Sequence, residues 1–259
     1  MNHKKWKRFD KLTEKCFYTM TGMEKDRECW NHAFELFQEL VNDMKSGQPN
    51  GKLELYQVDD ITDFEYDVQG WLDDYLDELD MNSEFEHLLE VCDALLEMFS
   101  WEDDDSSEIK FRKVSVLGAL KRNDEAAELC RQWLADEPDN ISAVTASVYA
   151  SLARHDMETA EKLITQHISE DTQCTDENDI LFTAASTYYQ AAGKKKEKKR
   201  IDQAIKAYEK FLEEYWLGDD ESDDEFVWGE DDEGDDGFAW REDDEDDDEL
   251  AWGEDELPF

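Results

Sequence analysis

The chain has 259 residues with 71 acidic and 27 basic side chains, which gives a formal net charge of −44. Contacts with nucleic-acid phosphates need clustered Lys and Arg, so this composition argues against nucleic-acid binding. An anionic membrane surface is disfavoured for the same reason. The electrostatic partners that such a chain favours are basic proteins, cations or a basic patch of the same chain.

The sequence predicts a cytoplasmic protein without disulfides, metal or cofactor. Its start, MNHKKWKRFDKLTEKCF, has charges but no apolar core of signal-peptide length, and no run approaches the ~20 apolar residues of a membrane span. The five cysteines lie far apart and include no C-x-x-C pair, so we expect reduced, buried thiols rather than a disulfide framework or a zinc site. These are Cys16, Cys29, Cys92, Cys130 and Cys174.

Residues 1–104 are expected to form a helical region, either as degenerate repeats or as a cap. The segment CWNHAFELFQEL has an apolar pattern that includes Ala33 and Phe37. Farther on, apolar residues recur in steps of three and four, which predicts the buried stripe of an amphipathic helix. That stripe comprises Phe64, Val68, Trp71, Leu72, Tyr75 and Leu79. In the following segment, Ser83 and Glu86 form a capping-box signature.

The segment from Asp59 to Glu108 is acidic and contains no Lys or Arg. One interpretation is a solvated helical face followed by an exposed loop, WEDDDSSE. The other is a docking surface for a basic partner. The first is favoured, although uninterrupted charge of one sign lowers stability through repulsion.

Residues 105–217 are predicted to form six helices with short breaks. Asp105 and Glu108 can cap the first helix, and residues 121–123 separate it from the second, which ends at Pro138. Asp156 can cap the fourth helix, and Gly193 falls near a turn between the last two. Short connections favour antiparallel neighbours, and no segment has the strict alternation of a strand, so the chain is predicted to be all-α.

The stretch LGALKRNDEAAELCRQWLADEPDN resembles a tetratricopeptide repeat (TPR). Its matching positions are Leu117, Leu120, Ala126, Cys130, Trp133 and Pro138. A second copy, VYASLARHDMETAEKLITQHI, matches at Ala160, Ile164 and His167. A third, from residue 184 to 215, matches at Ala185, Tyr188, Ala204, Tyr208 and Phe211, with extra residues KKKEKK that are expected to lengthen its hairpin. The Trp and Gly typical of the first helix are absent, so a generic helical solenoid is the alternative.

The resemblance implies a superhelix of antiparallel helical hairpins, a TPR-like solenoid with a concave groove. Its pattern places six residues on that groove, where aromatic rings can anchor a partner. They are Phe111, Ser115, Tyr149, Phe182, Ser186 and Tyr189. In a shifted alignment these aromatics would lie in the core instead, and Tyr149 is the most sensitive to such a shift.

Residues 218–259 form an acidic tail, with 23 Asp and Glu against one Arg, and this composition predicts disorder. A motif of an apolar residue, a spacer and Trp recurs every twelve residues, and three copies suit a multivalent target. The motif residues are Phe226 and Trp228, Phe238 and Trp240, and Leu250 and Trp252. The target is either a separate basic partner or a basic segment of this chain. The candidates within the chain are the N-terminal KKWKR and the range Lys194–Arg200, where a returning tail could inhibit the groove.

Catalytic motifs are sparse: the chain has no Gly-rich phosphate loop, no H-E-x-x-H and no G-x-S-x-G. The expected function is therefore non-catalytic protein binding, as an adaptor or scaffold that uses the groove and the Trp motifs. The alternative is a holding chaperone for a basic client, whose positive charge the acidic residues would shield. Chaperone binding should be strongly salt-sensitive, whereas groove recognition should depend more on aromatic residues.

Overall fold

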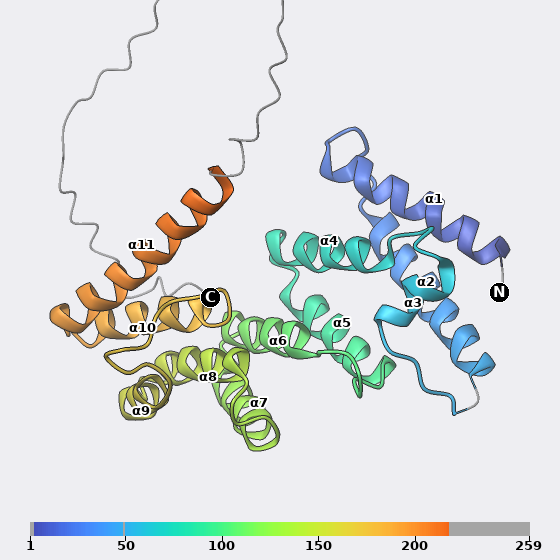
Figure 1. Cartoon of the computed structure of the whole chain (residues 1–259). Helices are drawn as coiled ribbons and strands as arrows, with labels where there is room; N and C mark the ends of the chain where they lie inside the picture. The colour runs from blue at the N-terminus through green and yellow to red at the C-terminus, as the bar shows by residue number, and fades with distance from the viewer. Residues whose placement is uncertain (1–2, 49, 218–259) are drawn as a thin grey trace, which may run out of the picture.

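The computed structural model describes residues 3–48 and 50–217, and it is all-helical over those residues, as predicted (Figure 1). The first five helices are α1 (His3–Met20), α2 (Glu28–Gly47), α3 (Tyr56–Thr62), α4 (Val68–Met81) and α5 (Phe85–Met98). The six helices predicted beyond residue 105 are α6 (Ser107–Ala119), α7 (Asn123–Asp136), α8 (Ile141–Ala153), α9 (Met157–His167), α10 (Asp179–Ala191) and α11 (Lys195–Leu217). The predicted acidic tail lies outside the described residues.

Consecutive helices pack against each other along most of the chain, from α1 with α2 to α10 with α11. The helix α8 is central, because it packs against its neighbours α7 and α9 and also against α6 and α10. One side of α8 contributes Ala143, Ala146 and Ala150 to a core that extends back to Trp6. Its other side contributes Val144 and Val148 to a core shared with α9, α10 and α11. Residues on either side of position 104 therefore share one hydrophobic core.

Four helix pairs are joined by the same three-residue turn, and its middle residue has a left-handed backbone. The middle residues are Ser83 (φ 57°), Lys121 (φ 59°), His155 (φ 58°) and Gly193 (φ 67°). In each turn the third residue donates its N–H to a carbonyl five residues back, which satisfies an end carbonyl of the preceding helix. These bonds join Glu84 to Leu79 (2.9 Å), Arg122 to Leu117 (2.8 Å), Asp156 to Ser151 (2.9 Å) and Lys194 to Tyr189 (2.9 Å). The helical hairpin is thus a recurring unit from α4 to α11.

The shared turn corrects two expectations. Ser83 is the left-handed residue of its turn and does not cap α5, whose first residues receive no side-chain cap, so the predicted capping box is absent. The residues KKKEKK do not lengthen the turn of their hairpin, because α11 begins at Lys195 after a turn of the usual length; all but the first of them belong to α11, which has 23 residues. Two other predicted boundaries are confirmed: Gly193 lies in a turn, and Asp156 caps α9 by accepting the N–H of Thr159 at 3.1 Å.

Most of the predicted core positions are buried. They include Ala33, Phe37, Trp71, Tyr75, Ala126, Cys130, Trp133, Ala160, Ile164, Ala185 and Tyr188. Phe64 is an exception, because it lies in the left-handed loop between α3 and α4 with 67% of its surface exposed. All five cysteines are buried and unbridged, as expected, and burial raises the pKa of Cys92 to about 12. Among the described helices, none combines the length and apolarity needed to cross a bilayer.

Candidate functional site

The aromatic residues predicted to line a groove lie in or against the core. Phe182 and Tyr189 on α10 are buried, with exposed fractions of 0% and 4%. Phe111 and Tyr149 are half-buried, and each packs against one of the two cores. The expectation of an open binding surface is corrected for Phe182 and Tyr189, which the register places inward as in the shifted alignment. For Phe111 and Tyr149 it stays a prediction.

The other predicted partner-binding residues have varied surroundings. Ser115 on α6 is half-buried, and Ser186 on α10 donates its hydroxyl to Asp202 of α11 at 2.6 Å. The six residues of the Trp motifs lie outside the described residues. They are Phe226, Trp228, Phe238, Trp240, Leu250 and Trp252.

The two basic segments proposed as targets of the tail are already partly engaged within the fold. Lys194 pairs with Glu161, Lys198 pairs with Asp202 at 2.7 Å, and Arg200 donates to the carbonyl of Ser169 at 2.8 Å. In the N-terminal segment, Trp6 is buried in the core and Lys5 pairs with Glu39 and Asp43. These contacts reduce the positive charge that either segment offers to another chain.

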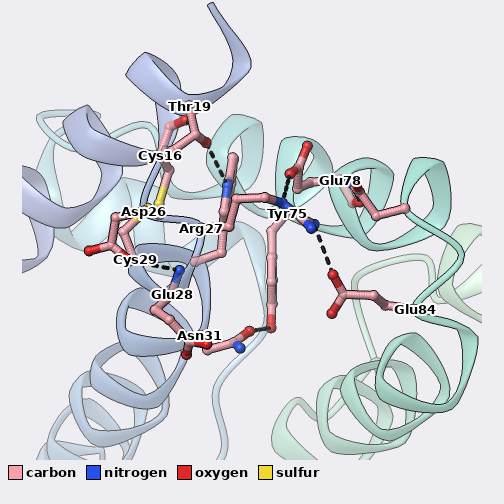
Figure 2. Close-up of polar contacts among 12 residues, drawn as sticks. Cys16, Thr19, Asp26, Arg27, Glu28, Cys29, Asn31, Tyr75, Glu78 and Glu84 are labelled. Carbon is pink, nitrogen blue, oxygen red and sulfur yellow. Dashed lines mark hydrogen bonds and ion pairs between the residues drawn. The ribbon is translucent and has the colours of Figure 1, made fainter. Parts of the chain in front are cut away.

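Basic residues from outside the acidic segment 59–108 neutralise part of it. Arg27, which precedes α2, donates to Glu78 at 2.6 Å and to Glu84 at 2.8 Å, so its guanidinium connects α4 to the turn before α5 (Figure 2). Four further basic residues act similarly: Lys52 with Glu102, Arg112 with Asp77 and Glu108, Lys113 with Asp93, and Arg122 with Glu86. Part of the segment is therefore a structural face that basic residues of other elements brace.

The buried carboxylate of Asp59, on α3, holds the start of α4. It accepts the backbone N–H groups of Val68 at 2.7 Å and Gln69 at 3.1 Å, and the side-chain amide of Gln69 at 3.2 Å. The first N–H groups of a helix have no partner within it, and the positive end of the helix dipole attracts a negative charge. Asp59 thus supplies, from another helix, the hydrogen-bond acceptors that the first N–H groups of α4 lack. This contact also fixes the direction in which the residues of α4 point.

A cavity of about 390 Å³ lies between α1, α2 and the start of α4. Two sets of residues with the spacing of a single helix face line it. They are Asp10, Thr13, Glu14 and Phe17 from α1, and Asp67, Gly70, Trp71 and Asp74 from α4 and the residue before it. Trp30 from α2 and Tyr66 complete the lining. We call these ten residues the acidic aromatic pocket.

Stacked rings hold the aromatic wall of this pocket in place. The ring of Tyr75 is nearly parallel to Trp30 and to Trp71, with centroids 5.8 Å apart in both pairs. The Tyr75 hydroxyl donates to Asn31 of α2 at 3.0 Å, which ties α4 to α2 (Figure 2). Tyr66 stacks on Trp6 at 4.9 Å. Because Phe17 is 57% exposed, its ring forms an accessible edge beside these buried rings.

The four carboxylates of the pocket, from Asp10, Glu14, Asp67 and Asp74, take part in none of the ion pairs found within residues 3–48 and 50–217. Burial raises the pKa of Asp74, and repulsion from Asp77 and Asp67 raises it further. The carboxylate of Asp67 lies against Gly70, where an added Cβ would meet both of its oxygens at 2.8 Å. The absence of a side chain at Gly70 leaves room for this charge at the pocket.

The arrangement suits a cationic group. Carboxylates attract an ammonium or guanidinium ion, and aromatic rings bind such ions through their negative faces. The sequence indicated one part of this site, namely the acidic segment without basic residues. It missed the pocket, because the matching face of α1 and the ring of Trp30 come from segments that only the tertiary fold brings to α4.

No known family model, curated protein or solved structure matches this chain. Within the described residues, no group of three or more His, Cys, Asp or Glu side chains could hold a metal ion.

Proposed function

We propose that this chain is a non-catalytic protein-binding module, an adaptor or scaffold, whose acidic aromatic pocket binds a basic segment of a partner protein. The observation that carries this proposal is the contrast between two groups of acids. Four acids elsewhere on α4 and α5 are braced by basic residues, namely Asp77 by Arg112, Glu78 by Arg27, Glu86 by Arg122 and Asp93 by Lys113. The four pocket carboxylates form no such ion pair and gather beside aromatic rings. An arginine or lysine of a partner would supply the missing charge and contact the rings.

The repeated hairpin supports the scaffold part of this proposal. Arrays of stacked helical hairpins present extended surfaces on a rigid frame. The four identical turns and the packing of α8 against both α6 and α10 favour a solenoid of tetratricopeptide type. In such an array the N-terminal helices would hold the binding pocket, and the hairpins from α6 onward would act as its support.

A peptide titration tests the proposed function. The probes are two fluorescein-labelled peptides of equal length, one with arginines separated by glycines and one with glutamates in place of the arginines. The full chain should bind the first peptide and not the second. Phe17→Ala should weaken binding of the arginine peptide by roughly two- to fivefold, because an exposed cation–π contact contributes about 0.5–1 kcal/mol.

Phe64→Ala is the matched control, since Phe64 is similarly exposed, lies in the loop before α4, and is not part of the pocket lining. Fluorescence anisotropy gives the dissociation constants. Equal losses in the two variants would contradict a role for the pocket rings. Steep loss of binding with salt, combined with no effect of either substitution, would favour the holding chaperone instead.

A further inference from the structure

The first helix carries the largest positive charge of any helix in residues 3–48 and 50–217. α1 has six Lys and Arg against two Asp and Glu, so its net charge is +4 in a chain whose net charge is −44. α2 is its main packing partner, and Figure 1 shows α1 at the edge of the molecule. Much of the surface of α1 is therefore open to solvent.

Five of the six basic residues lie on one exposed face of α1. Each follows another at a spacing of three or four residues, which places them along one side of three helical turns. They are Lys4, Lys7, Arg8, Lys11 and Lys15, and we call them the basic face. The sixth, Lys5, points toward α2 instead, where it pairs with Glu39 at 3.2 Å and Asp43 at 2.9 Å.

The basic face takes part in none of the ion pairs found among the described residues. Lys15 attracts Glu24 of the loop after α1, but the two do not form an ion pair. The two acids of α1, Asp10 and Glu14, line the acidic aromatic pocket on another side of the helix, and Glu14 accepts the hydroxyl of Tyr18 at 3.0 Å. The positive charge of the face is therefore left for another segment.

The basic side chains of α11 are arranged differently. That helix has seven Lys and Arg against five Asp and Glu, so its net charge is only +2. Lys198 and Lys210 pair with acids of α11 itself, and Arg200 donates to the carbonyl of Ser169. Charge complementarity therefore favours α1 over α11 as the contact for an acidic segment.

We propose that the basic face of α1 binds residues 218–259 of the same chain. That segment has 23 acidic residues against one Arg, and in each of its three motifs Glu-Asp follows Trp after one residue. The carboxylates can pair with the basic side chains of the face, and the Trp rings can contact the same side chains through their negative faces. This interaction goes beyond the binding proposed for the acidic aromatic pocket and uses a different side of α1.

Chain length permits the contact. The segment 218–259 has 42 residues and follows Leu217 at the end of α11, so it spans at most about 150 Å when extended. A compact domain of about 215 residues has a radius of gyration of about 17 Å. The segment can therefore reach α1 although α1 and α11 are the first and last helices. Covalent attachment also makes the contact independent of protein concentration.

Carbodiimide cross-linking of the full chain tests this proposal, because it joins a lysine ammonium group to a carboxylate that contacts it. Mass spectrometry identifies the joined peptides, and the ion pair of Lys5 with Asp43 gives a reference yield. We expect the lysines of the basic face to join acids of residues 218–259 within one molecule. Their yield should be several-fold higher than that of three exposed lysines of α11. These are Lys195, Lys196 and Lys199.

Two triple variants of equal net charge supply the matched control. The first combines Lys7→Gln, Arg8→Gln and Lys11→Gln, and the second combines Lys195→Gln, Lys196→Gln and Lys199→Gln. Each changes the net charge from −44 to −47, and all six residues are exposed, so both variants should fold. Cross-linking of Lys4 and Lys15 to the acidic segment should slow roughly tenfold in the first variant, which corresponds to about 1.4 kcal/mol and lies within the range of three exposed ion pairs. In the second variant it should slow by less than about twofold.

Three results would overturn the proposal. Bonds between differently isotope-labelled molecules in a mixed sample would show that the acidic segment of a second copy covers α1. Absent bonds from the basic face, or yields equal to those of the α11 lysines, would show that the segment does not prefer this face. Equal slowing in the two triple variants would show that net charge alone brings the segment to the surface. None of these results depends on whether the pocket binds a basic partner, because the sample contains no partner peptide.

Discussion

At the scale of single residues, the most informative side chain is Asp74, because its charge lowers the stability of the folded protein. Asp74 is half-buried beside Asp67 and Asp77 and has no basic partner among the described residues, so its charge is unfavourable in the folded state. On the neighbouring surface, Asp77, Glu78 and Glu86 avoid this situation through Arg112, Arg27 and Arg122. Groups that lower stability locally occur mainly at functional sites, which supports the pocket as a binding site.

Asp74→Asn should therefore stabilise the protein at neutral pH. Because the folded state raises the pKa of this carboxyl above its unfolded value, the ionised form is unfavourable above the folded pKa. The gain should be about 0.5 kcal/mol in the free energy of unfolding, since the group is partly solvated. The gain should disappear as the pH falls through the raised pKa, where protonation removes the same charge from the natural protein.

Urea unfolding at pH 7 and at pH 4 measures this difference. Asp171→Asn, which alters an exposed acid in the loop after α9, is the control and should change stability little at either pH. A lower stability of Asp74→Asn at pH 7 would contradict the description of Asp74 as a repelled, desolvated charge.

At the scale of elements, helices were predictable from apolar spacing, but their connections were only partly predictable. Gly193 was identified as a turn residue because glycine adopts a left-handed backbone without strain. The same left-handed position in the other three turns is occupied by Ser83, Lys121 and His155. A side chain is unfavourable there by about 1–2 kcal/mol, so these residue types did not indicate a left-handed turn. For the same reason Phe64, in another left-handed position, was wrongly assigned to a buried helical stripe.

Paired substitutions in two of these turns test their equivalence. Gly193→Ala should lower the free energy of unfolding by about 1 kcal/mol, because alanine is strained at φ 67°. His155→Gly should raise it by up to about 1 kcal/mol, because relief of strain at φ 58° exceeds the added entropy of glycine in the unfolded chain. Chemical unfolding of both variants gives the two values. Changes of the same sign would show that the turns are not energetically equivalent.

At the scale of the whole molecule, the sequence indicated an all-α chain and an acidic surface, but not where a partner would bind. The groove residues were assigned from a repeat pattern, and a small error of register moved Phe182 and Tyr189 into the core. The pocket joins residues from Asp10 to Asp74 on three helices, so no local pattern contains it. Net charge attracts a basic partner over the whole surface, whereas pocket geometry determines where the partner is held.

The most direct measurement separates these two effects. Asp67→Asn combined with Asp74→Asn, and Glu170→Gln combined with Asp171→Asn, both change the net charge from −44 to −42, but only the first pair alters the pocket. The dissociation constant of the arginine peptide should rise by roughly tenfold in the pocket variant, since close charge pairs contribute about 1.5 kcal/mol or more, and by less than about twofold in the control. Equal increases in both variants would contradict binding at the pocket.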